Sequence, residues 1–321
     1  MAEIAVELNA AICAVWKDSP HVLTVPSSSH NDIAALPSGP FEPAVDRTIE
    51  RGVRRWVREQ TALDLGYVEQ LYTFGDRYRD PRERAGGPRV LSLGYLALVR
   101  IAPEDISRKA GAWRDWYDFF PWEDWRAGKP AVLERLIRPR LTSWCRNSSS
   151  KTEQTERRER VEISFGFSRK TWNRDAALER YELLYEAGLV AEAEDAGSSG
   201  DFGEPMALDH RRILATAMSR LRGKITYRPM IFELVPPTFR LSDLQRTAEA
   251  LAGVRLHTAN FRRLVESEGL VEPAGSRVVR TGGRPAQAFR FRKEVLLERP
   301  SPGVRAPQPG GGFRPRISQN E

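Results

Sequence analysis

The segment 241–292 constrains the fold most, because start and stop signals for two short helices lie within it. Ser242 and Gln245 form an S-x-x-Q capping box for a first helix, and Gly253 offers the left-handed residue that ends it. Thr258 then offers an N-cap for a second helix. Two short helices joined this tightly predict a helix-turn-helix.

After Gly269, which ends the second helix, the sequence has the pattern of a β-hairpin. Residues 270–272 and 287–292 have strand character, and a Gly-Gly-Arg-Pro sequence at 282–285 lies in the tip between them. A hairpin that directly follows a helix-turn-helix is typical of a winged helix. The sequence therefore predicts a C-terminal winged helix-turn-helix domain.

The same region carries a concentrated positive charge. Residues 254–293 contain nine basic and three acidic side chains, a net charge of +6, whereas the whole chain has +7. Basic side chains release condensed counterions from DNA phosphates, so this pattern predicts binding to double-stranded DNA. An ordinary solvated basic face and nonspecific nucleic-acid binding are the alternatives. The expected DNA-binding residues are Thr258, Asn260, Arg262, Arg263, Arg277, Arg280 and Arg284. Asparagine suits adenine, and arginine suits guanine or phosphate.

Composition bounds the remaining possibilities. A chain of 321 residues has room for about two domains, and 40% hydrophobic and 29% charged residues are typical of a globular protein. The N-terminal residues lack a basic leader and a long apolar run, so we expect a cytoplasmic protein without a membrane span. Two cysteines and four scattered histidines form no metal-binding or catalytic pattern, so we expect neither a metal nor a catalytic residue.

The N-terminal half mixes strands and helices. Strand patterns occupy 4–16, 21–25, 66–73 and 90–101, and an amphipathic helix begins at Thr48. This order predicts a layered α+β architecture.

The middle of the chain is helical with one flexible stretch. Residues 131–146 and 174–186 have helical patterns, and the polar run 147–160 is either flexible or a solvent-facing helix. The aromatic tract 113–125 suits core packing, with a dimer contact as the alternative. A further helix is expected to begin at Asp209.

The helix after Thr48 resembles the signature helix of the Nudix fold. Active Nudix enzymes carry the pattern R-E-U-x-E-E-x-G-U, in which U is aliphatic, and residues 55–63 match it only in part. Trp56 and Gln60 replace two glutamates, Ala62 replaces the glycine, and Glu59 remains. Several clustered carboxylates are needed to hold magnesium against a pyrophosphate, so this helix indicates a degenerate, catalytically idle domain.

The combination with the basic C-terminal region is more specific. Together with Leu71-Tyr72-Thr73-Phe74-Gly75-Asp76, Asp209-His210-Arg211-Arg212 and Gly283-Arg284-Pro285, the chain resembles the Nudix-related (NrtR-like) transcriptional regulators of NAD metabolism, and among them the alphaproteobacterial branch called NadQ. The resemblance implies a homodimeric repressor that binds a palindromic operator. It also implies a Nudix-like domain that senses an effector such as ADP-ribose, NAD or another NAD-pathway nucleotide.

These inferences predict four segments. A degenerate Nudix-like α/β/α sensing domain with a helical insertion occupies 1–190, a linker occupies 191–205, a winged helix DNA-binding domain occupies 206–296, and a disordered tail occupies 297–321. The alternative is an active Nudix hydrolase of ADP-ribose or a dinucleotide with a DNA-binding appendage.

A nucleotide site is expected near the end of the third predicted strand. Arginine side chains suit a diphosphate, and aromatic rings stack on a base. The expected ligand-binding residues are Tyr72, Phe74, Arg77, Arg79 and Arg82. As an alternative, the arginines pair with the neighbouring acids Asp76, Asp80 and Glu83 on an exposed turn.

Overall fold

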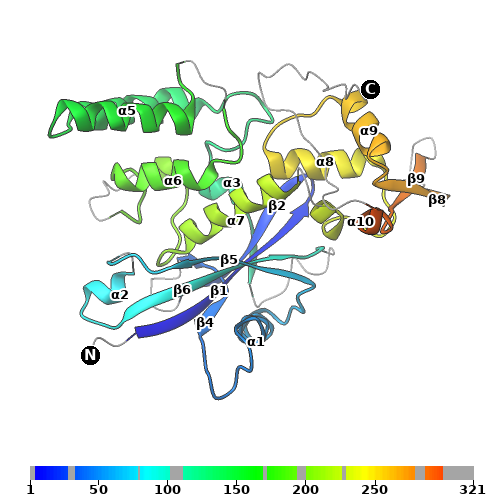
Figure 1. Ribbon diagram of the computed structural model, residues 1–321, viewed down its shortest axis with the longest axis horizontal. Helices are drawn as coiled ribbons and strands as arrows, with labels where there is room; N and C mark the ends of the chain where they lie inside the picture. Colours follow the sequence, from blue (N-terminus) through cyan, green and yellow to red (C-terminus); the bar gives the residue numbers. More distant parts are fainter. Residues whose placement is uncertain are drawn as a thin grey trace, which may run out of the picture.

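The computed structural model describes residues 4–27, 33–78, 80–101, 111–168, 172–193, 200–225, 229–278 and 286–298. A sheet covered by helices on both faces is followed by a smaller helical unit that ends in a two-stranded hairpin (Figure 1). This arrangement confirms the predicted α+β class. The tail predicted from residue 297 lies outside the described residues from 299 onward.

The large sheet is built around one long central strand, β1 (Ile4–Trp16), which has the predicted bounds. The strand order is β3-β2-β1-β6-β5, and the pairing of β1 with β6 is parallel whereas that with β2 is antiparallel. Successive side chains of β1 point to opposite faces, as the period of two requires. The other strands are β2 (Ser19–Pro26), β3 (Ala34–Ala35), β4 (Ser38–Pro40), β5 (Tyr67–Phe74), β6 (Arg89–Leu98) and β7 (Ala112–Asp115).

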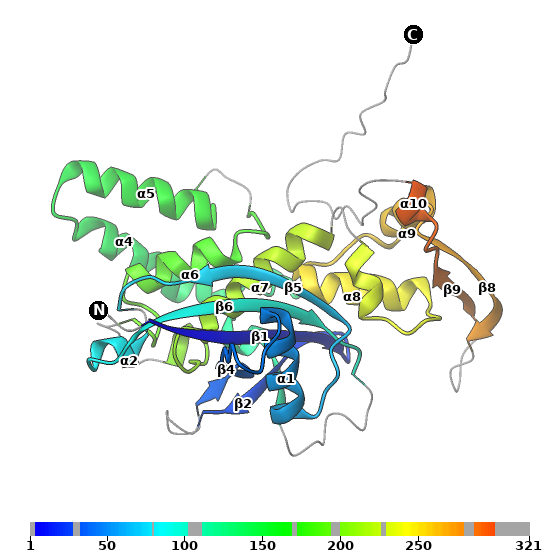
Figure 2. The same cartoon turned by 60° about the horizontal axis from the view of Figure 1, so that its bottom comes forward.

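Helices cover the two faces of this sheet unequally (Figure 2). One face packs against α1 (Ile49–Thr61) through a cluster that includes Leu8, Ile12 and Val53. The other face supports α3 (Trp116–Phe119), α6 (Ala177–Glu186) and α7 (His210–Ile225). Buried side chains of the aromatic tract 113–125 lie in this second layer, so the core packing expected of that tract is confirmed.

A helical hairpin projects from the second layer. It consists of the π-helical turn η2 (Leu133–Ile137), α4 (Arg138–Arg146) and α5 (Lys151–Phe165). The Ser150 hydroxyl caps α5 by accepting the Glu153 N–H at 3.1 Å, and Gly166 ends it at φ 60°. Most residues of α5 are exposed, so the polar run after residue 147 forms the solvent-facing helix that was one of its two expected states.

The C-terminal unit follows α7. It contains η4 (Pro229–Glu233), α8 (Leu241–Ala252), α9 (Thr258–Ser267), the hairpin strands β8 (Val271–Val278) and β9 (Ala286–Phe291), and α10 (Val295–Glu298). Two other short helices, α2 (Pro81–Arg84) and η3 (Gly200–Phe202), lie earlier in the chain.

The helix ends of this unit correct two capping predictions. The N-cap of α8 is Arg240, whose N–H donates to the Asp243 carboxylate at 3.3 Å, so Ser242 lies inside the helix. The N-cap of α9 is His257, and Thr258 is the first helical residue. Gly253 ends α8 in the left-handed conformation as predicted, at φ 68°.

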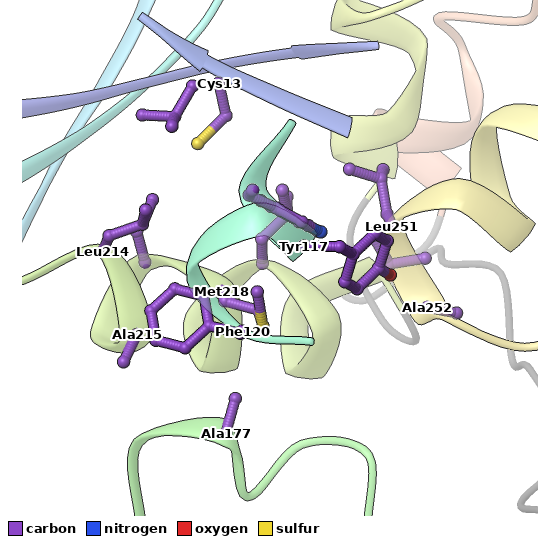
Figure 3. Packing of buried hydrophobic residues seen from close by; sticks show 14 of the residues in the cluster. Cys13, Tyr117, Phe120, Ala177, Leu214, Ala215, Met218, Leu251 and Ala252 are labelled. Carbon is purple, nitrogen blue, oxygen red and sulfur yellow. The ribbon is translucent and has the colours of Figure 1, made fainter. Parts of the chain in front are cut away.

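One buried cluster extends through both parts of the chain. Cys13 of β1, Met218 of α7 and Leu251 of α8 all belong to it, and Figure 3 shows Tyr117 lying beside Leu251 and Ala252. Phe202 of η3, within the predicted linker, is also buried in this cluster. The predicted domain limits remain a prediction.

Candidate nucleic-acid interface and nucleotide site

The helix α9 is anchored on one face and open to solvent on the other. Phe261 and Val265 are buried, whereas Asn260, Arg262 and Arg263 are exposed. The basic face of this predicted recognition helix is therefore accessible.

The polar side chains of that face make contacts that are easily exchanged. The Arg263 guanidinium donates to the Asn260 side-chain oxygen at 3.1 Å, and Arg262, whose side chain is 59% exposed, lies 3.5 Å from the Glu266 carboxylate. Exposed pairs of this kind contribute little to stability. Both arginines can therefore leave them for a phosphate or a base at low cost.

The turn between α8 and α9 is fixed by two side chains of α8. The Glu249 carboxylate accepts the Leu256 N–H at 3.0 Å, and the Gln245 side-chain amide donates to the Leu256 carbonyl at 3.0 Å. The same amide donates to the Thr258 hydroxyl at 3.3 Å. These bonds set the angle at which α9 leaves α8.

Glu249 is held in its charged form. Burial raises the pKa of its carboxyl, but the hydrogen bonds from Leu256, Gln245 and Arg255 outweigh that effect, so the pKa lies below its usual range. The Arg255 guanidinium lies 2.8 Å from this carboxylate. The folded turn therefore stabilises the ionised form of Glu249.

The hairpin packs on the base of the helical unit. Phe239 and Phe289 exchange two backbone hydrogen bonds of 2.8 and 2.9 Å, and Phe291 stacks on Phe232 with ring centroids 4.3 Å apart. The predicted hairpin is thus confirmed. The backbone of Arg277 lies in β8, opposite Gln287, whereas Arg280 and Arg284 lie outside the described residues.

The helix that resembles the Nudix signature is fastened to the short strand β4. Trp56, at the position of a glutamate, donates its ring N–H to the Pro40 carbonyl at 2.8 Å and covers Gly39 so closely that a Cβ there would collide with the indole. Gln60, at the second replaced position, makes two hydrogen bonds with the Ser38 backbone. Both substituted side chains therefore fill the space next to β4.

The carboxylate that remains in this helix is peripheral. Glu59 is 50% exposed and lies 3.7 Å from the Arg55 guanidinium, one helical turn away. Arg55 makes shorter contacts with Asp46, and this hydrogen bonding lowers the pKa of the Asp46 carboxyl. Within the described residues, no group of three or more His, Cys, Asp or Glu side chains is placed to hold a metal ion.

The predicted nucleotide-binding residues divide into an exposed and a paired set. Tyr72 is 61% exposed, whereas Phe74 is buried beside it with the ring centroids 5.3 Å apart. Arg82 is paired with Asp80 and Glu7, as the alternative interpretation expected for Asp80. The Arg77 guanidinium lies 4.6 Å from the ring centroid of Tyr78, and Arg79 lies outside the described residues.

Sequence reasoning named Arg212 only within the family resemblance and did not assign it to this end of the sheet. The Arg212 guanidinium lies 5.1 Å from the ring centroid of Phe74 and 2.5 Å from the Asp76 carboxylate. It also pairs with Glu182 of α6. Because Arg212 comes from α7, far away in the sequence, only the folded chain brings it to β5.

A second missed feature is a fully buried charge cluster at the junction with α8. The Glu123 carboxylate binds the guanidinium groups of Arg180 and Arg222, and all three side chains have no exposed surface. Burial raises the pKa of Glu123, but the two arginines outweigh it and keep the pKa below its usual range. Glu123 therefore remains charged inside the core.

This cluster holds the end of α8. Arg222 donates to the Leu251 carbonyl at 2.9 Å, and the Tyr117 hydroxyl donates to the Ala250 carbonyl at 2.7 Å. The backbone N–H of Trp125 donates to the Gly253 carbonyl at 2.7 Å. The carbonyls that a helix leaves unpaired at its C-terminus are thus bound by residues from outside the C-terminal unit.

Sequence comparison identifies the C-terminal unit. Residues 231–291 match the family model described as the NrtR DNA-binding winged helix domain. An ADPR responsive transcriptional repressor of Acinetobacter baylyi is 37% identical over 86 residues, which cover 27% of this chain and 34% of that protein. The matched segment thus spans about a third of the length of that relative.

Structural comparison extends to nearly the whole chain. Shewanella oneidensis NrtR, crystallised with a 27mer DNA, superposes with a TM-score of 0.58 at 19% identity, covering 94% of this chain and 99% of that one. A MutT/nudix family protein from Enterococcus faecalis gives a TM-score of 0.52 at 16% identity and covers 91% of this chain and 88% of that one. The fold is therefore that of a Nudix-like domain followed by a winged helix.

Residues 231–291 therefore resemble the NrtR winged helix domain in sequence. None of the helices in the described part of the chain is long and apolar enough to span a membrane.

Proposed function

We propose that this chain is an ADP-ribose-responsive transcriptional repressor of the NrtR type that regulates genes of NAD synthesis or salvage, and that it belongs to the alphaproteobacterial NadQ branch. It acts in the cytoplasm, as a homodimer that binds a palindromic operator. The observation that carries this proposal is the exposed basic face of α9 behind a fixed turn, joined to a Nudix-like domain. The repressor of Acinetobacter baylyi named above supports the choice of effector.

DNA recognition is assigned to α9 and the hairpin. Asn260, Arg262 and Arg263 face solvent, as base or phosphate contacts require, and Thr258 begins the helix beside them. We further assign Arg277, Arg280 and Arg284 of the hairpin to phosphate contacts. Two such units in a dimer read half-sites about 34 Å apart, one helical turn of DNA.

The effector is assigned to the end of β5. Tyr72 offers an exposed ring and Arg77 an exposed guanidinium, and we assign Arg79 and Arg82, close to Arg77 in sequence, to the same site. The buried ring of Phe74 packs edge-on against the ring of Tyr72. The effector changes operator affinity only if it binds the DNA-competent and DNA-free arrangements of the dimer with different strength.

The contacts of Trp56 and Gln60 with β4 support a regulator without catalysis. Hydrolysis of a pyrophosphate by a Nudix enzyme requires a cluster of carboxylates around magnesium, and these two positions carry an indole and an amide. The competing hydrolase hypothesis predicts magnesium-dependent cleavage of ADP-ribose that Glu59→Gln abolishes. Nucleotide products separated by chromatography distinguish the two hypotheses.

Operator binding tests the DNA-reading assignment. A duplex selected by the protein from a random pool is titrated by fluorescence anisotropy with wild type, Asn260→Ala, Arg262→Ala and Arg263→Ala. Removing a side chain that reads a base weakens binding by about 1–3 kcal/mol and relaxes specificity at one position, whereas removing one that binds a phosphate weakens binding to all sequences. Arg51→Ala, at an exposed arginine of α1, is the control and retains wild-type affinity.

The same titration with added ADP-ribose, NAD or NAD precursors tests the effector. We expect ADP-ribose to release the duplex, and we expect Tyr72→Ala and Arg77→Ala to bind DNA normally but to respond weakly. Sedimentation of the protein with its duplex gives the number of chains bound. Operator binding that is indifferent to every nucleotide contradicts the sensing function and leaves DNA recognition intact.

A further inference from the structure

The helical hairpin carries a stretch of positive charge that the proposed function does not use. Residues 135–151 contain five basic side chains and no acidic one. We call these five residues the α4 patch: Arg135, Arg138, Arg140, Arg146 and Lys151. All five are exposed.

The spacing of the patch follows the helix repeat. Leu133, Ile137, Leu141 and Cys145 recur every four residues and are buried, and the first three belong to the main buried cluster. Arg135 and Arg146 lie on solvent-facing positions, whereas the Arg138 guanidinium lies 5.6 Å from the ring centroid of Phe167 at the edge of the buried face. The fold therefore leaves all five cations accessible to solvent.

Most of the patch lacks acidic partners. Arg138 pairs with Glu134 at 3.0 Å, whereas the described part of the chain offers no ion pair to Arg135, Arg140, Arg146 or Lys151. Neighbouring arginines of α5 behave differently, because Arg157 pairs with Glu153 and Arg160 with Glu186. Exposed cations without an acidic partner among the described residues attract a polyanion.

The remaining exposed positions of α4 and of the turn after it are polar. They include Thr142, Ser143 and Asn147, whose hydroxyl and amide groups hydrogen-bond phosphate oxygens in protein–DNA complexes. The cations together with these hydrogen-bonding groups suit the phosphate backbone of a nucleic acid.

The placement of the hairpin agrees with this choice. Figures 1 and 2 both show the α4–α5 hairpin and α9 at opposite ends of the same side of the molecule. A duplex held by α9 that continues along this side comes to the hairpin beyond the bases that α9 reads.

We propose that the α4 patch is a second DNA-binding surface that contacts phosphates flanking the operator. The proposal rests on the proposed function, because α9 must first hold the duplex. The patch supplies affinity without sequence preference, since its contacts are with the phosphate backbone.

The test compares two duplexes and three forms of the full-length protein. One duplex contains only the selected operator, and the other adds random flanks on both sides. The proteins are wild type, the patch variant Arg135→Gln/Arg140→Gln/Arg146→Gln, and a control of equal charge, Arg47→Gln/Arg51→Gln/Arg100→Gln, at exposed arginines outside the hairpin. Affinity is measured as a function of salt concentration, and circular dichroism checks the fold of each protein.

We expect wild type and the control to bind the flanked duplex more tightly, and the patch variant to lose that advantage while binding the short duplex like wild type. The slope of log K against log salt for the flanked duplex should become shallower by about 0.9 for each phosphate that is no longer neutralised, up to about 2.7 for three. Arg135→Lys/Arg140→Lys/Arg146→Lys, which keeps the charge, should retain the wild-type slope.

Equal behaviour of the patch variant and wild type on both duplexes overturns the proposal, including the case in which the patch binds an acidic protein. Failure of wild type to bind any selected duplex refutes the proposed function instead. The two failures are therefore distinguishable.

Discussion

The side-chain amide of Gln60 is joined to the backbone of Ser38 by two hydrogen bonds. The Ser38 N–H donates to the side-chain oxygen at 3.0 Å, and the side-chain nitrogen donates to the Ser38 carbonyl at 2.7 Å. A carboxylate has no donor for the second of these bonds. The amide therefore suits this position as a link between α1 and β4.

Gln60→Glu should destabilise the protein. The variant loses the bond to the Ser38 carbonyl and places a charged oxygen beside it, at a cost of about 1–3 kcal/mol. Urea unfolding gives the difference, and Gln154→Glu on the exposed helix α5 serves as a control with little effect. Magnesium should not stabilise Gln60→Glu. Stabilisation by magnesium would contradict a purely structural role for position 60, because it would show that a metal site had been restored.

Ala62→Gly should stabilise the protein. Ala62 ends α1 in the left-handed conformation at φ 56°, which costs a residue with a Cβ about 1–2 kcal/mol, whereas the added entropy of glycine in the unfolded chain costs somewhat less. We expect a gain of about 0.5–1 kcal/mol in thermal or urea unfolding. Ala187, at φ −77° after α6, is the matched control, and Ala187→Gly should not stabilise.

Glu249→Gln should lower the stability of the helix-turn-helix. It should also make that stability less dependent on pH. The folded-state pKa of Glu249 lies below its usual value, so its contribution is complete above the unfolded pKa and is lost as the pH falls through the folded one. Wild type should lose stability between about pH 5 and pH 3, and the variant should lose less over that range. Unfolding at a series of pH values checks this, and parallel curves for the two proteins would refute it.

Glu123→Gln should be among the most destabilising single substitutions. It leaves Arg180 and Arg222 buried without a counter-charge, which costs about 3–5 kcal/mol. Glu134→Gln, which removes an exposed acid from a pair of surface ion pairs, is the control and should cost less than about 1 kcal/mol. A loss for Glu123→Gln no larger than for the control would show that the core tolerates the unpaired arginines.

Local patterns predicted the elements but not what fixes them together. The mostly apolar run from Ile4 to Trp16 marked the bounds of β1, and Gly253 marked the end of α8, because each signal lies within the element that it defines. The start of α8 was misplaced because Ser242 is a residue type that often caps helices. The helix instead begins after Arg240, whose backbone N–H donates to the Asp243 carboxylate. Competing local signals of similar strength cannot be ranked without the tertiary fold.

The site showed the same division. Asn260 and Arg262 were predicted to bind DNA from their residue types and their place in the second helix, and the structure exposes both. Arg212 and Glu123 gave no local signal, because their partners are distant in sequence and charged residues are usually exposed. The contacts of Trp56 and Gln60 with β4 depend equally on the folded chain.

The hydrogen bonds from Tyr117, Trp125 and Arg222 to the last carbonyls of α8 imply that neither half of this protein is autonomous. An excised winged helix leaves those carbonyls without their donors, and the isolated Nudix-like part leaves Arg222 without the Leu251 carbonyl. Moving the winged helix onto a foreign domain therefore requires Tyr117, Trp125 and Arg222 to be moved with it.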